Sequence, residues 1–295
     1  MKMKHNALPV ISVALGNILW GLSFLFIQTA LRYAASPVML AHRFTTAVVI
    51  LAVFALVTRK KITLKGKDWP SLAMLMVAQL AYYFFETQGL QYSNTTIAGL
   101  VLAVVPIVAI VTGAVFLKEY PTKRQVFLCL FPVAGVIIMT VSGKELGVMK
   151  PLGIVFLLCA CFSSAMYKTA NRKSARDFSP FERTFFVLLA SAITFTVAGF
   201  STVSWNVKSF FQPLTNFMYT GSVLFLGVFC SITADILVNF AAGRMPVLKV
   251  TAFGALSTLC TMVTGVLVLH EPMNLSLLLG AVLILFGIRK LTVSK

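Results

Sequence analysis

The sequence predicts an all-α membrane protein with ten transmembrane helices, arranged as two inverted five-helix repeats. The first observation is composition: 59% of the 295 residues are hydrophobic and 11% are charged, whereas soluble domains carry about 25% charged residues. Such a chain has more apolar surface than a water-soluble fold can bury. The second observation is that polar stretches and prolines divide the chain into ten apolar segments of about 20 residues, the length that crosses a bilayer as a helix.

The third observation is a motif that recurs at a constant spacing of 152 residues. The first copy comprises Val111-Thr112-Gly113, Leu117, Glu119 and Gly135, and the second comprises Val263-Thr264-Gly265, Leu269, Glu271 and Gly287. Five segments lie between the copies, and because five is odd the second copy would enter the membrane upside down. Inverted repeats of this kind are typical of secondary transporters. We therefore expect a first repeat over residues 1–143 and an inverted second repeat over 151–292.

The ten segments follow one another with short connections. They cover residues 8–31, 37–58, 69–91, 95–117, 122–142, 151–171, 180–200, 215–241, 246–269 and 273–291. The first is longer than the core of a signal peptide, so we expect it to be retained as a helix. Prolines lie near most of the predicted starts, where a helix loses nothing by the missing N–H. Pro106 and Pro132 instead lie within the fourth and fifth segments and predict a kink there.

Positive charge is distributed unevenly between alternate loops. With both termini in the cytoplasm, 19 of the 25 lysines and arginines fall on the inner side, four fall on the outer side, and Arg43 and Lys249 lie within segments. This bias predicts a multi-pass protein of the cell membrane with both termini cytoplasmic. The net charge of +17 therefore reflects membrane orientation and contact with lipid head groups, and we expect no nucleic-acid partner.

Neither metal nor nucleotide chemistry is indicated. The five cysteines lie in apolar segments without a CxxC spacing, and the three histidines have no metal-ligand spacing. The chain contains no Walker A loop, GxSxG motif or HExxH motif. We expect no cofactor, no metal and no enzymatic activity.

Several landmarks together carry a resemblance to a known family. They are Asn17, Trp20, Gly21 and Ser23; Ser36-Pro37 and Arg43; Gly89-Leu90, Tyr92-Ser93, Ala98, Pro106, Leu117, Glu119, Gln125 and Gly135; and Pro246, Gly265, Leu269, Glu271, Gly280, Ile284 and Gly287. In this order and spacing the chain resembles the ten-helix EamA-type branch of the drug/metabolite transporter superfamily. The resemblance implies two five-helix halves around a central cavity, lined by the third, fourth, eighth and ninth helices with help from the first and sixth. It also implies transport of small metabolites without a cofactor. Glu86 departs from the family, which usually has tyrosine or another neutral residue there.

Glu86 is the first candidate substrate-binding residue. It lies in the third segment, where Gln79, Tyr82 and Glu86 share one helix face. A charge in hydrocarbon costs at least about 2.5–3.5 kcal/mol on insertion scales, so it needs a partner or a water-filled cavity. Glu86 either holds a cationic amine or a coupling proton among aromatic side chains, or forms a fixed ion pair with Arg43 at a similar depth. Arg43 itself is either a scaffold residue or part of the site.

Asp235 is the second candidate, in the eighth segment. Ser231, Asp235 and Asn239 form a narrow polar stripe in an apolar helix, which should face protein or water rather than lipid. Asp235 and Asn239 either line the cavity, or Asp235 pairs with Lys249. Trp20 in the first segment is either an aromatic wall of the cavity or a packing anchor. Glu119 and Glu271 follow their helices closely, which favours a structural or gate-latch role through backbone donors of the next helix.

The sequence thus predicts a secondary transporter that works by alternating access. It would be a uniporter or a proton-coupled carrier of a small organic metabolite, with an amino acid or amine as the best candidate. A flippase for lipid-linked substrates and an intramembrane enzyme are the alternatives. The sequence leaves open the substrate, the direction of transport, the coupling ion, and whether the protein is a monomer or a homodimer.

Overall fold

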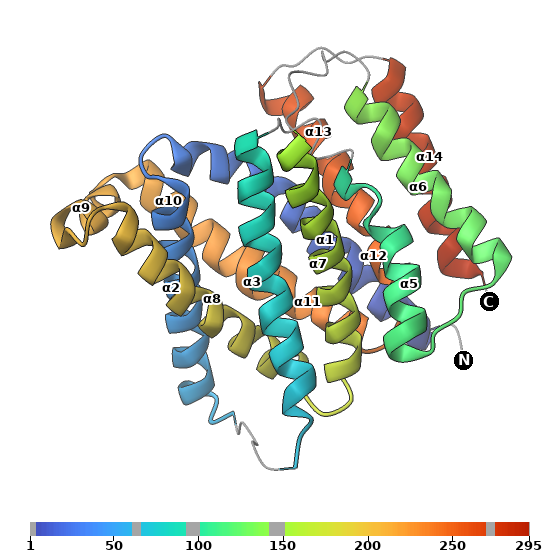
Figure 1. Cartoon of the computed structure of the whole chain (residues 1–295), viewed down its shortest axis with the longest axis horizontal. Helices are drawn as coiled ribbons and strands as arrows, with labels where there is room; N and C mark the ends of the chain where they lie inside the picture. Colours follow the sequence, from blue (N-terminus) through green and yellow to red (C-terminus); the bar gives the residue numbers. More distant parts are fainter. Residues whose placement is uncertain (1–3, 61–65, 93–100, 142–150, 270–274, 295) are drawn as a thin grey trace.

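Helices account for nearly all of the computed structural model, which describes residues 4–60, 66–92, 101–141, 151–269 and 275–294 (Figure 1). No strand occurs in these ranges. The helices are α1 (Lys4–Leu31), α2 (Ser36–Val57), α3 (Trp69–Tyr92), α5 (Val105–Leu117), α6 (Lys123–Val141), α7 (Pro151–Ser174), α8 (Pro180–Thr202), α9 (Val207–Phe211), the 3₁₀-helix η1 (Gln212–Thr215), α10 (Phe217–Phe225), the π-helical η2 (Leu226–Thr233), α11 (Ala234–Ala242), α12 (Val247–Ala252), α13 (Gly254–Leu269) and α14 (Leu275–Val293).

Five helical stretches are long and apolar enough to cross a membrane. They are Ala7–Leu31, Ser36–Val57, Pro151–Ser174, Pro180–Thr202 and the continuous run Phe217–Ala242. Two shorter apolar helices cover Val105–Leu117 and Val247–Thr261. Each of the ten predicted segments contains at least one described helix, because hydropathy alone marks such segments. That all ten cross the membrane stays a prediction.

The fourth and ninth predicted segments are not single helices. The fourth is interrupted by a turn at Ala103-Val104, and Pro106 occupies the first turn of α5 rather than a mid-helix position, so the predicted kink at Pro106 is wrong. A proline in the first turn costs no hydrogen bond, which explains why α5 begins there. The ninth segment is divided at Phe253 between α12 and α13. Pro132 lies inside α6, as predicted.

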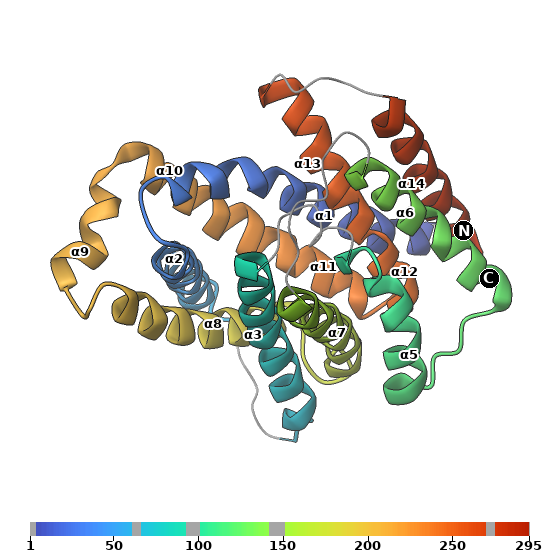
Figure 2. The same cartoon turned by 45° about the horizontal axis from the view of Figure 1, so that its top comes forward.

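Each long helix packs against partners distant in the sequence. In both views α3 lies beside α7 and α6 beside α14, while α1 runs along α11 (Figure 1, Figure 2). In addition, α2 packs on α8, α1 contacts α13, and α5 contacts α7. The largest buried cluster lies where α2, α8, α10 and η2 meet. Two of these contacts, α2 with α8 and α6 with α14, join helices that hold the same position in the two predicted repeats.

Glycines permit the closest helix crossings. A Cβ atom at Gly135 of α6 would lie 2.7 Å from the carbonyl oxygen of Gly280 and 2.7 Å from Cγ1 of Ile284 in α14. A Cβ atom at Gly287 of α14 would lie 2.8 Å from Cβ of Phe131 in α6. Small residues let backbones approach in membranes, where packing rather than hydrophobic burial drives helix association.

Replacing Gly287 by alanine is therefore expected to destabilise the protein by about 1–3 kcal/mol, the usual cost of overpacking. Thermal unfolding of the purified protein in detergent would measure the loss. Gly221→Ala is the matched control, because a Cβ at Gly221 in α10 has no neighbour within 4 Å. Equal stability of the two variants would contradict a tight α6–α14 crossing.

Candidate functional site

Arg43 is a buried charged residue within the apolar helix α2. It lies in the first half of α2 and is 7% exposed. Its Nε donates a hydrogen bond to Oγ of Ser231 in η2 at 2.8 Å, and its guanidinium carbon lies 5.3 Å from the centre of the Phe44 ring. In the described ranges Arg43 forms no ion pair with Glu86, so the structure does not bear out the fixed-pair alternative.

Glu86 is held on α3 by a neighbour on its own helix. The hydroxyl of Tyr82 donates a hydrogen bond to Oε1 of Glu86 at 2.6 Å. Gln79 lies within hydrogen-bonding reach of Tyr83, and the Tyr83 ring packs 5.6 Å from Phe44 and 5.7 Å from Phe195. The predicted polar face of α3 is therefore surrounded by aromatic rings from α2 and α8.

Asp235 is the first acidic residue after the π-helical turn η2. The indole of Trp20 donates from Nε1 to the carbonyl oxygen of Cys230 at 3.0 Å, and its side chain also lies within hydrogen-bonding reach of Asp235. Lys249 does not pair with Asp235: its Nζ donates to the carbonyl oxygens of Thr292 at 3.1 Å and of Ser294. π-helical turns are rare and frequently occur at functional sites, and nothing in the sequence indicates this one.

These side chains converge from four parts of the chain. Asp235 lies within electrostatic range of Arg43. Tyr83 lies within electrostatic range of Arg43, Asp235 and Glu86. The fold thus brings Trp20 of α1, Arg43 of α2, the Gln79–Glu86 face of α3 and Asp235 of α11 around one another. We call this group the mid-span cluster.

Asn239 belongs to a different environment, one turn further along α11. Its side-chain oxygen accepts a hydrogen bond from Nδ2 of Asn171 at 2.5 Å, and its own Nδ2 donates to Oγ1 of Thr184 at 2.7 Å. Arg183 donates to the carbonyl oxygens of Asn171 at 2.7 Å and of Asn239 at 2.6 Å, and also to Oδ1 of Asn171. The amide of Asn239 is thus committed to protein partners, and its contact with substrate stays a prediction.

Arg183 and Lys168 were counted with the inner side, at the ends of the seventh and sixth predicted segments, and both lie inside helices. Arg183 lies in the first turns of α8 and is 1% exposed. Lys168 lies within α7, which continues to Ser174. Hydropathy places helix ends only approximately, so basic residues near an end are easily counted with the loop.

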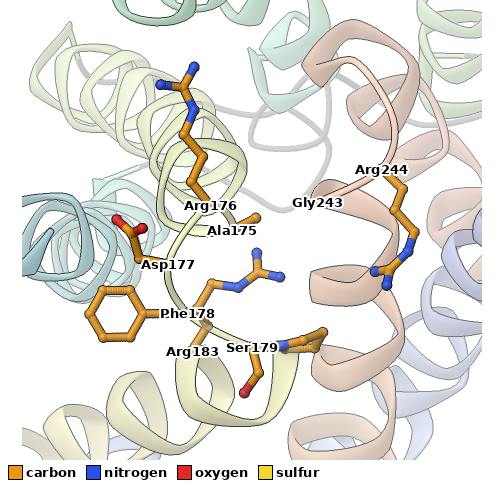
Figure 3. A pocket seen from close by; sticks show the side chains of 9 residues that line it. Ala175, Arg176, Asp177, Phe178, Ser179, Arg183, Gly243 and Arg244 are labelled. Carbon is orange, nitrogen blue, oxygen red and sulfur yellow. The ribbon is translucent and has the colours of Figure 1, made fainter. Parts of the chain in front are cut away.

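Two neighbouring cavities open near Arg183. The larger, about 480 Å³, is lined by Ala175, Arg176, Asp177, Phe178, Ser179, Pro180, Arg183, Gly243 and Arg244. The smaller, about 240 Å³, is lined by Leu117, Glu119, Arg172, Ala175, Arg176 and Gly243. Figure 3 shows the guanidinium of Arg183 between Ala175 and Gly243, whereas Arg176 and Arg244 extend to opposite sides. Neither cavity includes a residue of the mid-span cluster.

Polar contacts join the helices at this end of the molecule, which we call the Glu119 end. Nζ of Lys67 lies 2.6 Å from Oε1 of Glu182. Oε1 of Glu119 accepts from Nε of Arg172 at 2.9 Å, and its Oε2 accepts from the backbone N–H of Val247 at 3.0 Å. Glu119 thus binds a backbone donor as predicted, but the donor begins α12 rather than the next helix, α6. Its predicted counterpart Glu271 lies outside the described residues.

Taken together, the fold and the mid-span cluster define a multi-pass membrane protein with charged groups inside its apolar helices. The model of the EamA-like transporter family matches residues 7–141 and again residues 151–292, and the chain belongs to this family. The "Uncharacterized transporter YcxC" of Bacillus subtilis (strain 168) is 33% identical over 97% of this chain and 93% of its own length.

More distant relatives and a solved structure agree. An "Uncharacterized transporter" of Archaeoglobus fulgidus is 23% identical over 94% of this chain and 96% of its own length. A solved crystal structure aligns with a TM-score of 0.80, covering 97% of this chain and 98% of that chain at 18% identity. At this identity the likeness concerns the fold alone.

Proposed function

We propose that this protein is a secondary transporter of a small organic metabolite, an amino acid or an amine, in the cell membrane. The observation that carries the proposal is the mid-span cluster, in which Arg43, Glu86 and Asp235 lie inside apolar helices without a contact ion pair in the described ranges. Ionisable groups in membrane spans are costly and mark substrate or ion pathways by default. Membership of a transporter family supports the same conclusion.

Several pairs of features support two inverted repeats over 1–143 and 151–292. The turn at Ala103-Val104 and the division at Phe253 interrupt the fourth segments of the two halves. The contact of α3 with α7 has its counterpart in that of α11 with α1, and α5 with α7 corresponds to α13 with α1. Discontinuous helices at corresponding positions are typical of inverted-repeat transporters.

The Glu119 end supports alternating access. Lys67 and Glu119 belong to the first proposed repeat, and Glu182, Arg172 and Val247 belong to the second. Contacts between the halves at one end must break when that end opens, so they act as a latch. The positive charge of the adjoining loops supports a cytoplasmic position for this end and for both termini. In this proposal the structure corresponds to a state closed to the cytoplasm.

The cluster favours a substrate that bears positive charge. Two carboxylates, Glu86 and Asp235, accompany one arginine and the aromatic rings of Trp20 and Tyr83. Aromatic faces attract ammonium groups, and carboxylates bind them directly. The same carboxylates are suited to carry a coupling proton, which would make the protein a proton-coupled carrier rather than a uniporter.

Replacing Glu86 by glutamine is expected to weaken binding of cationic substrates by about 10–100-fold, because a hydrogen bond to a charged group contributes about 1.5–3 kcal/mol. Binding of amines and amino acids to the purified protein would be measured by thermal shift across pH. Asp177→Asn is the matched control, since Asp177 is an exposed carboxylate outside the cluster. Unchanged affinity together with unchanged pH dependence would remove Glu86 from the mechanism.

A further inference from the structure

We propose that Arg43 determines substrate specificity: its guanidinium binds a carboxylate of the substrate while Asp235 binds the ammonium group, so the site selects zwitterions over simple amines. This inference rests on the proposed transport function. It goes further by assigning the anionic half of the substrate, which the carboxylates of the cluster leave unspecified.

Arg43 is anchored through one of its three guanidinium nitrogens. Only its Nε is engaged, by Oγ of Ser231 at 2.8 Å. In the described ranges no residue accepts a hydrogen bond from its two terminal nitrogens. Among the described residues, the fully buried side-chain polar atoms without a partner are Nε2 of His42 and Nε of Arg183. The terminal nitrogens of Arg43 do not belong to that group. A fixed arginine with both terminal nitrogens available matches the two oxygens of a carboxylate.

Asp235 lies four residues after Ser231, the residue that anchors Arg43, on the same continuous helical run. It lies within electrostatic range of Arg43 without forming an ion pair with it. Trp20 fixes the local geometry because its indole bonds the carbonyl oxygen of Cys230 in η2, the turn that precedes Asp235. The scaffold thus holds two opposite charges near each other without a contact ion pair.

A zwitterion suits this pair of charges better than a simple amine does. Two desolvated charges that do not touch are costly, and one ligand that carries both opposite charges compensates both side chains at once. An amine would satisfy Asp235 and leave the guanidinium of Arg43 uncompensated. Tyr83, which lies within electrostatic range of both Arg43 and Asp235, adds an aromatic face for the ligand.

The alternative is a purely structural Arg43, attracted to Asp235 through space and anchored to Ser231. A ligand series separates the two roles. Isothermal titration of the purified full-length protein would compare L-phenylalanine with 2-phenylethylamine and with L-phenylalanine methyl ester, and L-leucine with isoamylamine. The amines lack the carboxylate of the matching amino acid, and the methyl ester carries a neutral ester in its place.

Wild type is expected to bind each amino acid at least about tenfold more tightly than its amine or ester. Arg43→Gln should reduce this ratio to about one, because amino-acid binding loses the partner of the carboxylate. Arg43→Lys should keep part of the preference, because it retains the charge but loses the fork. Ser231→Ala, which removes only the anchor, should lower the ratio less than Arg43→Gln.

Equal binding of amines and amino acids by wild type would overturn the inference and leave the proposed function standing. An unchanged ratio in Arg43→Gln would also overturn it. Should wild type bind neither class, the proposed function fails instead. The wild-type series decides the matter even if Arg43→Gln does not fold.

Discussion

Removing both ion pairs that join the halves at the Glu119 end in the described ranges should open that end. In the double variant Lys67→Met with Glu119→Ala, the ion pair to Glu182 and the bonds to Arg172 and Val247 are lost together. Charge-assisted hydrogen bonds contribute about 1.5–3 kcal/mol each when shielded. Because Glu119 and Arg172 are about a quarter exposed, we expect a combined loss of about 3 kcal/mol, which shifts the population toward the open state about 100-fold.

Lys67→Met is preferred to a change at Glu182 because Glu182 also completes the capping box of α8 with Ser179. Removing Glu182 would therefore disturb the helix start as well as the latch. Lys118→Met serves as the matched control. Lys118 is an exposed lysine at the same end and forms no ion pair in the described part of the chain.

The readout is the separation between the halves. Spin labels at Lys123→Cys and Arg176→Cys occupy exposed positions on the two sides, in a background whose five cysteines are replaced by alanine. Electron–electron double resonance in lipid nanodiscs should give a longer distance for the double variant and an unchanged one for Lys118→Met. If the double variant keeps the wild-type distance, these contacts do not latch the protein.

Most of the helices could be predicted because hydropathy is a strong and local signal. Apolar runs of membrane length have few other uses, and prolines mark their starts. The breaks were not predictable in the same way. The turn at Ala103-Val104 and the π-helical η2 lie inside continuous apolar sequence, so only packing against other helices decides them.

The members of the mid-span cluster were predictable one by one, but their partners were not. A charge in an apolar span attracts attention because of its cost, which singled out Arg43, Glu86 and Asp235. Depth along a helix suggested Glu86 as the partner of Arg43, yet Ser231, 188 residues away, is what binds it. The depth of a residue along its helix does not decide which side chain it contacts. The rotation of the helix and the identity of the neighbouring helices decide that as well.

Arg183 shows the same limit most clearly, because its place near the start of a predicted segment gave no sign that the fold buries it. It is 1% exposed and donates to the carbonyl oxygens of Asn171 and Asn239, in the last turns of α7 and α11. Those carbonyls lie at the negative ends of two helix dipoles. One guanidinium therefore joins the ends of two helices to the start of α8.

Replacing Arg183 by methionine is expected to cost about 3–5 kcal/mol of stability. The substitution keeps most of the volume but removes three hydrogen bonds from a charged donor, at about 1.5–3 kcal/mol each, and the charge that compensates both helix ends. In the described ranges the carbonyl oxygens of Asn171 and Asn239 then keep only the 3.3 Å bonds from Oγ of Ser174 and from the backbone N–H of Gly243. Relief from burying a cation offsets part of this, as Arg183 has no carboxylate partner in the described ranges. The hydrogen bonds outweigh that relief because at least three are lost together.

Denaturant or thermal unfolding in detergent would measure the effect against Arg244→Met. Arg244 is exposed and stacks over Phe240 at 3.7 Å, so its removal deletes an identical charge at the same end for about 0.5 kcal/mol or less. Arg183→Lys should fall between the two, because one ammonium cannot span both carbonyls with the geometry of the fork. A protein in which Arg183→Met and Arg244→Met unfold alike would mean that α7 and α11 hold their ends without this arginine.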